Sequence, residues 1–218
     1  MKIEVLDAEE AVAERAASII AEAAREGASA RGRFAFAVSG GRTPWVMLTA
    51  LTGKDVQWPA FHVFQVDERV APPGDPDRNL THLTASFLAH AALRSEQIHA
   101  MPVELPDLSA AAKSYSDELR ELCGEPPVLD LARLGLGPDG HTASLVPGDP
   151  MLDVVDHDVG LTGVYQGRRR MTLTYPVLNA ARQLLWVVTG KRRLRRLPGS
   201  CPPIPPFPGD GCDRTLLA

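Results

Sequence analysis

LARLGLGPDGHTASLVPG, residues 131–148, is the stretch that decides the fold of this chain. It begins as a short, mostly apolar strand, and the glycine- and proline-rich segment that follows predicts a tight turn. Glycine lets backbone N–H groups approach an anion closely, because no Cβ blocks positive φ. His141 follows the turn, and imidazole is the side chain whose ordinary pKa lies nearest neutral pH. The stretch therefore predicts an anion-binding loop with a base at its edge. The loop residues that we assign to substrate binding are Gly137, Asp139, Gly140 and Thr142.

The same glycines fit a second pattern. Gly135, Gly137 and Gly140 match GxGxxG, the dinucleotide-binding fingerprint, which calls for an acidic residue about 20 positions later at the end of a second strand. Two aspartates stand near that distance, but the residues around them, VVDHDVG (154–160), make a poor strand. Pro138 also lacks the N–H that a pyrophosphate would need. A nucleotide site and a purely structural turn remain the alternatives to a phosphosugar site.

Composition indicates an ordinary globular protein. The chain has 218 residues, of which 44% are hydrophobic, and a formal net charge of −4. It can therefore bury a sizeable core, and its charge balance gives no case for binding nucleic acid or an anionic membrane. Three cysteines without metal-ligand spacing, and a start, MKIEVL, without signal-type regions, favour a reducing compartment. We expect a cytoplasmic protein that is a monomer or a weak homodimer.

Apolar strands alternate with helical patterns along the chain. The predicted strands are residues 2–6, 34–38, 61–66, 131–134, 170–174 and 184–188. The predicted helices are residues 7–27, with a capping box at Asp7 and Glu10, then 45–51, 80–92 and 109–122, and a short helix that Pro176 opens. This alternation predicts an α/β fold with a mostly parallel, Rossmann-like central sheet flanked by helices, and a small additional lobe. We assign residues 1–190 to this domain.

Three polar loops follow three of the predicted strands. SGGRTP (39–44) follows one strand, DER (67–69) a second, and the glycine-rich loop a third. Ligands of parallel α/β sheets bind at the carboxyl ends of the strands, so these loops converge if the strands are neighbours. The first loop would then form a second anion-binding site at a helix N-terminus. Its candidate residues are Ser39, Gly40, Gly41, Arg42 and Thr43.

Four segments together carry a family resemblance. SGGRTP (39–44), VDERVAPPGDPDRN (66–79), LGLGPDGHTASLVPG (134–148) and RMTLTYPVLNAA (170–181) resemble, in this order and spacing, the 6-phosphogluconolactonase family, which is related to the glucosamine-6-phosphate deaminases and isomerases. The resemblance implies hydrolysis of 6-phospho-D-glucono-1,5-lactone to 6-phosphogluconate in the pentose phosphate pathway, without metal or organic cofactor. The deaminase branch usually has an aromatic residue after the glutamate of the second segment, where this chain has Arg69.

The resemblance also implies roles for individual residues. His141 would take a proton from the attacking water and return it to the ring oxygen. Asp67 would orient the imidazole or the water. Arg69 and the amides of the loop from Gly137 to Gly140 would hold the phosphate and the developing oxyanion, and Arg170 would join them. A deaminase or isomerase acting on an amino-sugar phosphate, and an inactive phosphosugar-binding protein, remain alternatives.

Two features depart from the family pattern. Arg133 lies inside a strand that is apolar in the family, so its guanidinium must find a partner or reach the surface. Residues 191–218 form an atypical tail, in which Arg193 stands where the family has a phosphate-binding lysine. Six prolines between positions 198 and 208 forbid a helix there. We interpret this stretch as an altered reading frame, with a PxxP ligand for a partner domain as the alternative.

Overall fold

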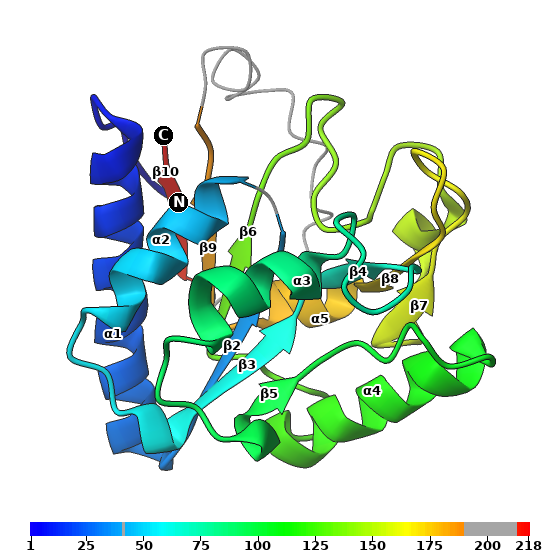
Figure 1. Cartoon of the computed structure of the whole chain (residues 1–218), viewed down its shortest axis with the longest axis horizontal. Coiled ribbons are helices and arrows are strands. Elements are labelled where there is room, and N and C mark those ends of the chain that lie inside the picture. Colours follow the sequence, from blue (N-terminus) through cyan, green and yellow to red (C-terminus); the bar gives the residue numbers. More distant parts are fainter. Residues whose placement is uncertain (41, 190–212) are drawn as a thin grey trace.

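The computed structural model describes residues 1–40, 42–189 and 213–218, without the side chains of residues 42–44. Within these residues, a seven-stranded parallel sheet has the order β1-β10-β9-β6-β2-β3-β5 (Figure 1). Its strands are β1 (Lys2–Glu4), β2 (Phe34–Val38), β3 (Phe61–Gln65), β5 (Ile98–His99), β6 (Leu131–Leu134), β9 (Gln183–Val187) and β10 (Asp213–Leu217). The predicted α/β fold with a mostly parallel central sheet is confirmed.

Helices cover both faces of this sheet. They are α1 (Glu9–Arg31), α2 (Arg42–Thr52), α3 (Asn79–Leu83), which continues as one π-helical turn (Thr84–Leu88), α4 (Leu108–Cys123) and α5 (Tyr175–Ala180). Short 3₁₀ helices span Trp58–Ala60, Ser95–Gln97 and Pro150–Asp153. Within the described ranges, no helix combines the length and the apolar character that crossing a bilayer requires.

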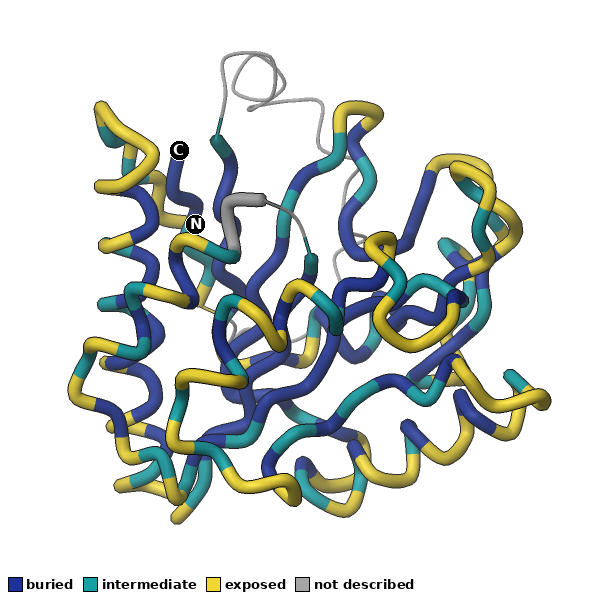
Figure 2. Tube along the Cα trace, viewed as in Figure 1, coloured by how far each residue is buried: buried dark blue, intermediate teal, exposed yellow. Residues whose placement is uncertain are grey.

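Alternate residues of the central strands enter two separate cores. Phe34 and Phe36 of β2 join the core beneath α1, α2 and α3, whereas Ala35 and Ala37 join the core shared with α4, α5 and the smaller sheet. All residues of β2 are therefore buried, as the tube coloured by burial shows (Figure 2). Burial on both faces explains why this strand is a continuous apolar run and does not alternate with polar residues.

A second, smaller sheet lies beside the first. Its strands β4 (Asp67–Arg69), β8 (Arg170–Leu173) and β7 (Val159–Leu161) are antiparallel neighbours in the order β4-β8-β7. A single residue, Val66, joins β3 of the central sheet to β4. Its N–H donates to Val38 O at 3.0 Å and its carbonyl accepts from Leu173 N at 2.9 Å, so it is bonded to both sheets. This sheet is the small additional lobe that the sequence predicted.

The first helix differs from its predicted limits. It begins after Ala8, which has no side-chain cap, and Gly27 lies inside it. A Cβ on Gly27 would meet Phe34 Cδ2 at 2.9 Å, so this glycine permits close packing of the helix on β2. The helix ends at Gly32, which has φ 71° and donates its N–H to Ala28 O. The predicted capping box and the predicted end at Gly27 were therefore wrong.

The end of the chain belongs to the central sheet. We grouped Asp213–Leu217 with the atypical tail, but these residues form β10 between β1 and β9. Pairing on both edges satisfies the strand's backbone groups, and Leu216 and Leu217 are buried, one in each core. The domain assignment therefore has to include this strand. The rest of the stretch, residues 190–212, lies outside the described residues.

Arg133 finds partners inside the sheet. Its side chain is 1% exposed, and Nη1 lies 3.3 Å from Ser39 Oγ and 3.4 Å from Ser39 O. Nη2 donates to Val187 O at 3.4 Å. These acceptors stand at the carboxyl ends of β2 and β9, on either side of β6. The expected need for a partner is thus met by oxygen atoms of neighbouring strands.

Candidate active site

Three loops leave the carboxyl ends of adjacent strands. The strands β6, β2 and β3 are neighbours in the central sheet, and the three candidate loops follow them directly. The second loop differs from its prediction, because Asp67 and Arg69 belong to β4 of the smaller sheet. The predicted convergence of these segments at one edge of the sheet is confirmed. A hydrogen bond from Ser144 Oγ to Asp67 Oδ2 joins the glycine-rich segment to the second one.

His141 is paired with Asp139 in the glycine-rich loop. His141 Nδ1 lies 2.5 Å from Asp139 Oδ1, which also accepts from His141 N at 3.3 Å. Partial burial alone would raise the pKa of Asp139, but hydrogen bonds from His141 and Tyr165 lower it to about 2. Asp139 is therefore an ionised acceptor, so the ring nitrogen that faces it must carry a proton. In the neutral ring, the other nitrogen, Nε2, then holds the lone pair and is the atom that can act as a base.

The glycines of this loop do not act as we expected. Gly137 N donates to His141 O at 2.7 Å, and Gly140 N donates to Gly137 O at 3.1 Å. Both N–H groups are thus engaged within the turn, and the structure does not support the expectation that they hold the phosphate. A Cβ on Gly137 would meet His141 Nδ1 and Cε1 at 2.3 Å. This glycine instead makes room for the imidazole, and Gly140 supplies a positive φ of 95° for the turn.

Asp67 lies in a separate part of the site. Its Oδ2 accepts a 2.6 Å hydrogen bond from Ser144 Oγ, and its carbonyl accepts one of 2.8 Å from Asn79 Nδ2. We expected Asp67 to orient the imidazole or the water, but the carboxylate that contacts His141 is that of Asp139. The local sequence explains this difference, because a turn places the Asp139 carboxylate beside a ring only two positions away.

Two arginines lie side by side on adjacent strands of the smaller sheet. Arg69 and Arg170 are paired positions of β4 and β8. Burial, and then the charge of Arg69, lowers the pKa of Arg170. Among the described residues, the buried Nε atoms of both arginines have no hydrogen-bond partner. Two neighbouring cations with unused donors make a site suited to an anion.

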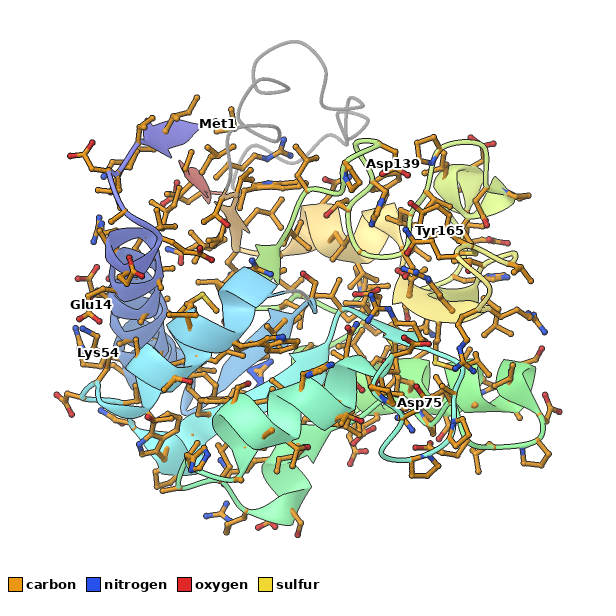
Figure 3. The ribbon with its side chains drawn as sticks, turned by 45° about the horizontal axis from the view of Figure 1, so that its top comes forward. Met1, Glu14, Lys54, Asp75, Asp139 and Tyr165 are labelled. Carbon is orange, nitrogen blue, oxygen red and sulfur yellow. The ribbon has the colours of Figure 1, made fainter. Side chains whose placement is uncertain are left out.

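Tyr165 connects these arginines to the His141 pair. Its hydroxyl donates to Asp139 Oδ2 at 2.9 Å, and its ring lies edge-on to the His141 ring with centroids 5.4 Å apart. The guanidinium carbon of Arg170 lies 4.9 Å from the centre of the Tyr165 ring. Figure 3 shows Asp139 and Tyr165 close together on two different loops. Arg170 Nη1 also lies 3.5 Å from Ser144 Oγ, which completes a connected set of contacts from His141 to Asp67.

Asn79 and Glu68 hold groups of this site in place, and sequence reasoning did not single them out. Asn79 Oδ1 accepts from Arg69 Nη1 at 2.7 Å, and a Cβ on Gly40 would meet the same atom at 1.9 Å. Glu68 is fully buried and accepts the N–H groups of Asn79 and Leu80 at 2.7 and 2.8 Å. It therefore fixes the start of α3 and, with it, the Asn79 side chain. Asn79 ends the segment VDERVAPPGDPDRN, and this was the only signal that could have identified it.

The remaining candidates lie at the edges of the site or outside the description. Ser39 is buried and accepts a hydrogen bond from Arg133, and Thr142 is buried with an Oγ1 atom that has no hydrogen-bond partner among the described residues. Arg42 and Thr43 belong to α2, but their side chains are not described. Gly41 and Arg193 lie outside the described residues.

Sequence comparison assigns the chain to a family. A family model described as "Glucosamine-6-phosphate isomerases/6-phosphogluconolactonase" matches residues 7–199, so the chain belongs to this family. A protein of Nostoc sp. named 6-phosphogluconolactonase is 34% identical over 195 residues, which are 88% of this chain and 81% of the relative.

Solved structures share the fold. The crystal structure of 6-phosphogluconolactonase from Thermotoga maritima matches with a TM-score of 0.85 and 24% identity, over 99% of this chain and 98% of that one. A monomeric glucosamine-6-phosphate deaminase matches with a TM-score of 0.81 and 17% identity, over 100% of this chain and 96% of that one. Both activities therefore occur on this fold, and the choice between them rests on the site and on the sequence relatives.

Proposed function

We propose that this protein is a 6-phosphogluconolactonase, which hydrolyses 6-phospho-D-glucono-1,5-lactone to 6-phosphogluconate in the cytoplasm. The contact that carries the mechanism is the one between His141 Nδ1 and Asp139 Oδ1, at 2.5 Å. In the neutral ring, this contact leaves Nε2 as the nitrogen that can take a proton from water. The relative at 34% identity, named for this reaction, supports the same assignment.

The chemistry needs one base and one water. Nε2 of His141 removes a proton as the water oxygen attacks the lactone carbonyl carbon, and the carbonyl electron pair moves to its oxygen. When the carbonyl re-forms, the bond to the ring oxygen breaks, and the imidazolium returns the proton to that oxygen. Asp139 stabilises the transient imidazolium. General acid–base help of this kind typically accelerates a reaction about 10²- to 10⁴-fold.

Arg69 and Arg170 supply the positive charge for the substrate. Their unused Nε donors and mutual repulsion favour an anion between or beside them. A charge-assisted hydrogen bond contributes about 1.5–3 kcal/mol. We therefore assign phosphate binding and oxyanion stabilisation to these two side chains, with the segment from Ser39 to Thr43 as a further phosphate contact.

A coupled assay tests this function. Purified protein is mixed with freshly made lactone, and 6-phosphogluconate is followed through its dehydrogenase, against the spontaneous rate. The wild type should exceed that rate greatly, and His141→Asn should lower kcat by about 10²-fold or more with little change in KM. Wild-type activity in His141→Asn would remove His141 from the mechanism.

Two further measurements separate the alternatives. Ammonia release from glucosamine 6-phosphate would indicate a deaminase. Binding of 6-phosphogluconate without any acceleration of lactone hydrolysis would indicate an inactive binding protein. Equal kcat/KM for gluconolactone with and without the phosphate would overturn the role of the two arginines.

A further inference from the structure

We propose that Tyr165 is a positioning residue of this site, whose hydroxyl fixes the Asp139 carboxylate behind His141 and whose ring fixes the Arg170 guanidinium. The inference rests on the proposed function and deepens it. It assigns a role to a residue in the short hairpin between β7 and β8, where no sequence motif pointed to function.

The hydroxyl acts on the second oxygen of Asp139. Oδ1 faces the imidazole at 2.5 Å, and Oδ2 accepts from Tyr165 at 2.9 Å. A carboxylate held by one oxygen can still rotate about its Cβ–Cγ bond, whereas bonds to both oxygens define its plane. Burial, followed by the bond to Asp139, raises the pKa of Tyr165, so its hydroxyl keeps the proton that it donates. The hydroxyl therefore determines which way the Asp139 acceptor points toward His141.

The ring acts on the cationic side of the site. The Arg170 guanidinium carbon lies 4.9 Å from the ring centre, and Nη2 donates to Gln166 Oε1 at 3.2 Å. Gln166, with φ 51°, and Gly167, with φ 79°, form the tip of the hairpin, which Tyr165 and Arg168 close with mutual backbone hydrogen bonds. The tip thus presents an aromatic face and an amide oxygen to one guanidinium. Without the ring, Arg170 would lose the surface that restricts its rotamers.

The charged groups around Tyr165 make this role specific. Asp139, at its hydroxyl, and Arg170, at its ring, are the two charges that shift its pKa, and His141 lies at its edge. The charge of Arg69 in turn lowers the pKa of Arg170, and the charge of Asp67 raises it. Tyr165 therefore lies between the His141–Asp139 pair and the two arginines. Its hydroxyl acts on the first, and its ring acts on Arg170.

Two substitutions distinguish the role of the Tyr165 hydroxyl from that of its ring. Tyr165→Phe keeps the ring and removes the hydroxyl, so kcat should fall about 2- to 10-fold, the range of one hydrogen bond, with KM within about twofold of wild type. Tyr165→Leu removes both, so kcat should fall similarly and KM should also rise about 3- to 10-fold. Val164→Ala is the matched control, because that side chain is 72% exposed in the same hairpin. Unchanged kcat in Tyr165→Phe, or unchanged KM in Tyr165→Leu, would overturn the proposal.

A second readout does not depend on turnover. The ring ¹⁵N signals of His141, assigned by their loss in His141→Asn, report which nitrogen carries the proton. At a pH where the ring is neutral, wild type and Val164→Ala should show mainly the Nδ1-protonated tautomer, whereas Tyr165→Phe should show a mixture of both tautomers. Identical spectra in wild type and Tyr165→Phe would overturn the proposal. If the wild type fails to hydrolyse the lactone but the tautomer changes, the proposed function fails and the positioning role stands.

Discussion

Ser144 Oγ donates a 2.6 Å hydrogen bond to Asp67 Oδ2 across 77 positions of sequence, and both side chains are almost completely buried. The same hydroxyl lies 3.5 Å from Arg170 Nη1. The Ser144 hydroxyl therefore contacts both the Asp67 carboxylate and the Arg170 guanidinium. This one atom ties the glycine-rich loop to the two strands that carry the charged residues.

Ser144→Ala should destabilise the protein and disturb the site. The substitution removes a hydrogen bond to a buried charged group, which costs about 1.5–3 kcal/mol. We expect a lower free energy of unfolding in urea and a lower kcat/KM. Ser95→Ala is the control, because Ser95 Oγ donates to the exposed carboxylate of Glu96, at 3.4 Å. Equal losses in the two variants would contradict a special role for the buried bond.

Gly137→Ala should impair catalysis, whereas Gly135→Ala should not. The added Cβ at 137 would lie 2.3 Å from the His141 ring, so the imidazole would have to move. At 135 the nearest atom, Arg133 Nη1, would be 3.8 Å away, an ordinary contact. We expect kcat to fall at least about tenfold in the first variant only, since misplacing a catalytic group by about 1 Å costs up to about 10²-fold. Similar kcat values in both variants would show that the His141 imidazole can adopt another position without loss of activity.

Arg168→Ala should weaken substrate binding more than it weakens the fold. Arg168 Nη2 lies 3.1 Å from Asp75 Oδ2 and 3.2 Å from Asp77 Oδ2, and the Asp77 carbonyl accepts from Arg69 Nη1 at 2.9 Å. These partly exposed ion pairs themselves contribute about 1 kcal/mol. Losing them frees the loop that holds Arg69, so KM should rise several-fold while Tm stays nearly unchanged.

Arg94→Ala is the control for this substitution, because it breaks the exposed pair with Glu96 far from the two arginines of the site. Added salt should raise the wild-type KM toward that of Arg168→Ala, since screening weakens exposed charge pairs. A large loss of Tm without a change in KM would show that Arg168 only stabilises the fold.

The sequence predicted the central strands β2, β3, β6 and β9 well because they are buried on both faces. Runs such as FAFAV, in β2, need no tertiary information to be recognised as buried strands. β10 was missed because its residues DRTLL alternate poorly, and only pairing with β1 and β9 stabilises them as a strand. The end of α1 was missed because Gly27 is required by the packing of Phe34, which periodicity does not reveal.

The site was predictable only in part, for a similar reason. Candidate residues in motifs, such as His141, Asp67 and Arg69, could be named because local patterns mark them. Tyr165 has no such pattern, and its importance arises from contacts with Asp139 and Arg170 that only the tertiary fold creates. The N–H groups of Gly137 and Gly140 are bonded within the turn, and such backbone hydrogen bonds cannot be read from the glycines in the sequence.

Cys123 gives a prediction for alkaline pH. Its thiol is 5% exposed at the end of α4, and burial raises its pKa to about 12. The folded protein therefore holds this proton where the unfolded chain, with a thiol pKa of about 8.5, releases it. A group whose pKa is raised on folding stabilises the fold fully below its unfolded pKa, and that contribution is lost as pH rises above it.

In a background with Cys201→Ser and Cys212→Ser, the free energy of unfolding in urea should therefore fall between pH 8.5 and 10. The thiol contributes a loss on the order of 1 kcal/mol per pH unit in that window. Adding Cys123→Ala should abolish this part of the slope while leaving the curve below pH 8 parallel. In the same background, the folded protein should react slowly with a disulfide reagent at pH 8, because the thiolate is both scarce and covered. Rapid labelling, or parallel stability curves up to pH 10, would show that Cys123 is accessible to solvent.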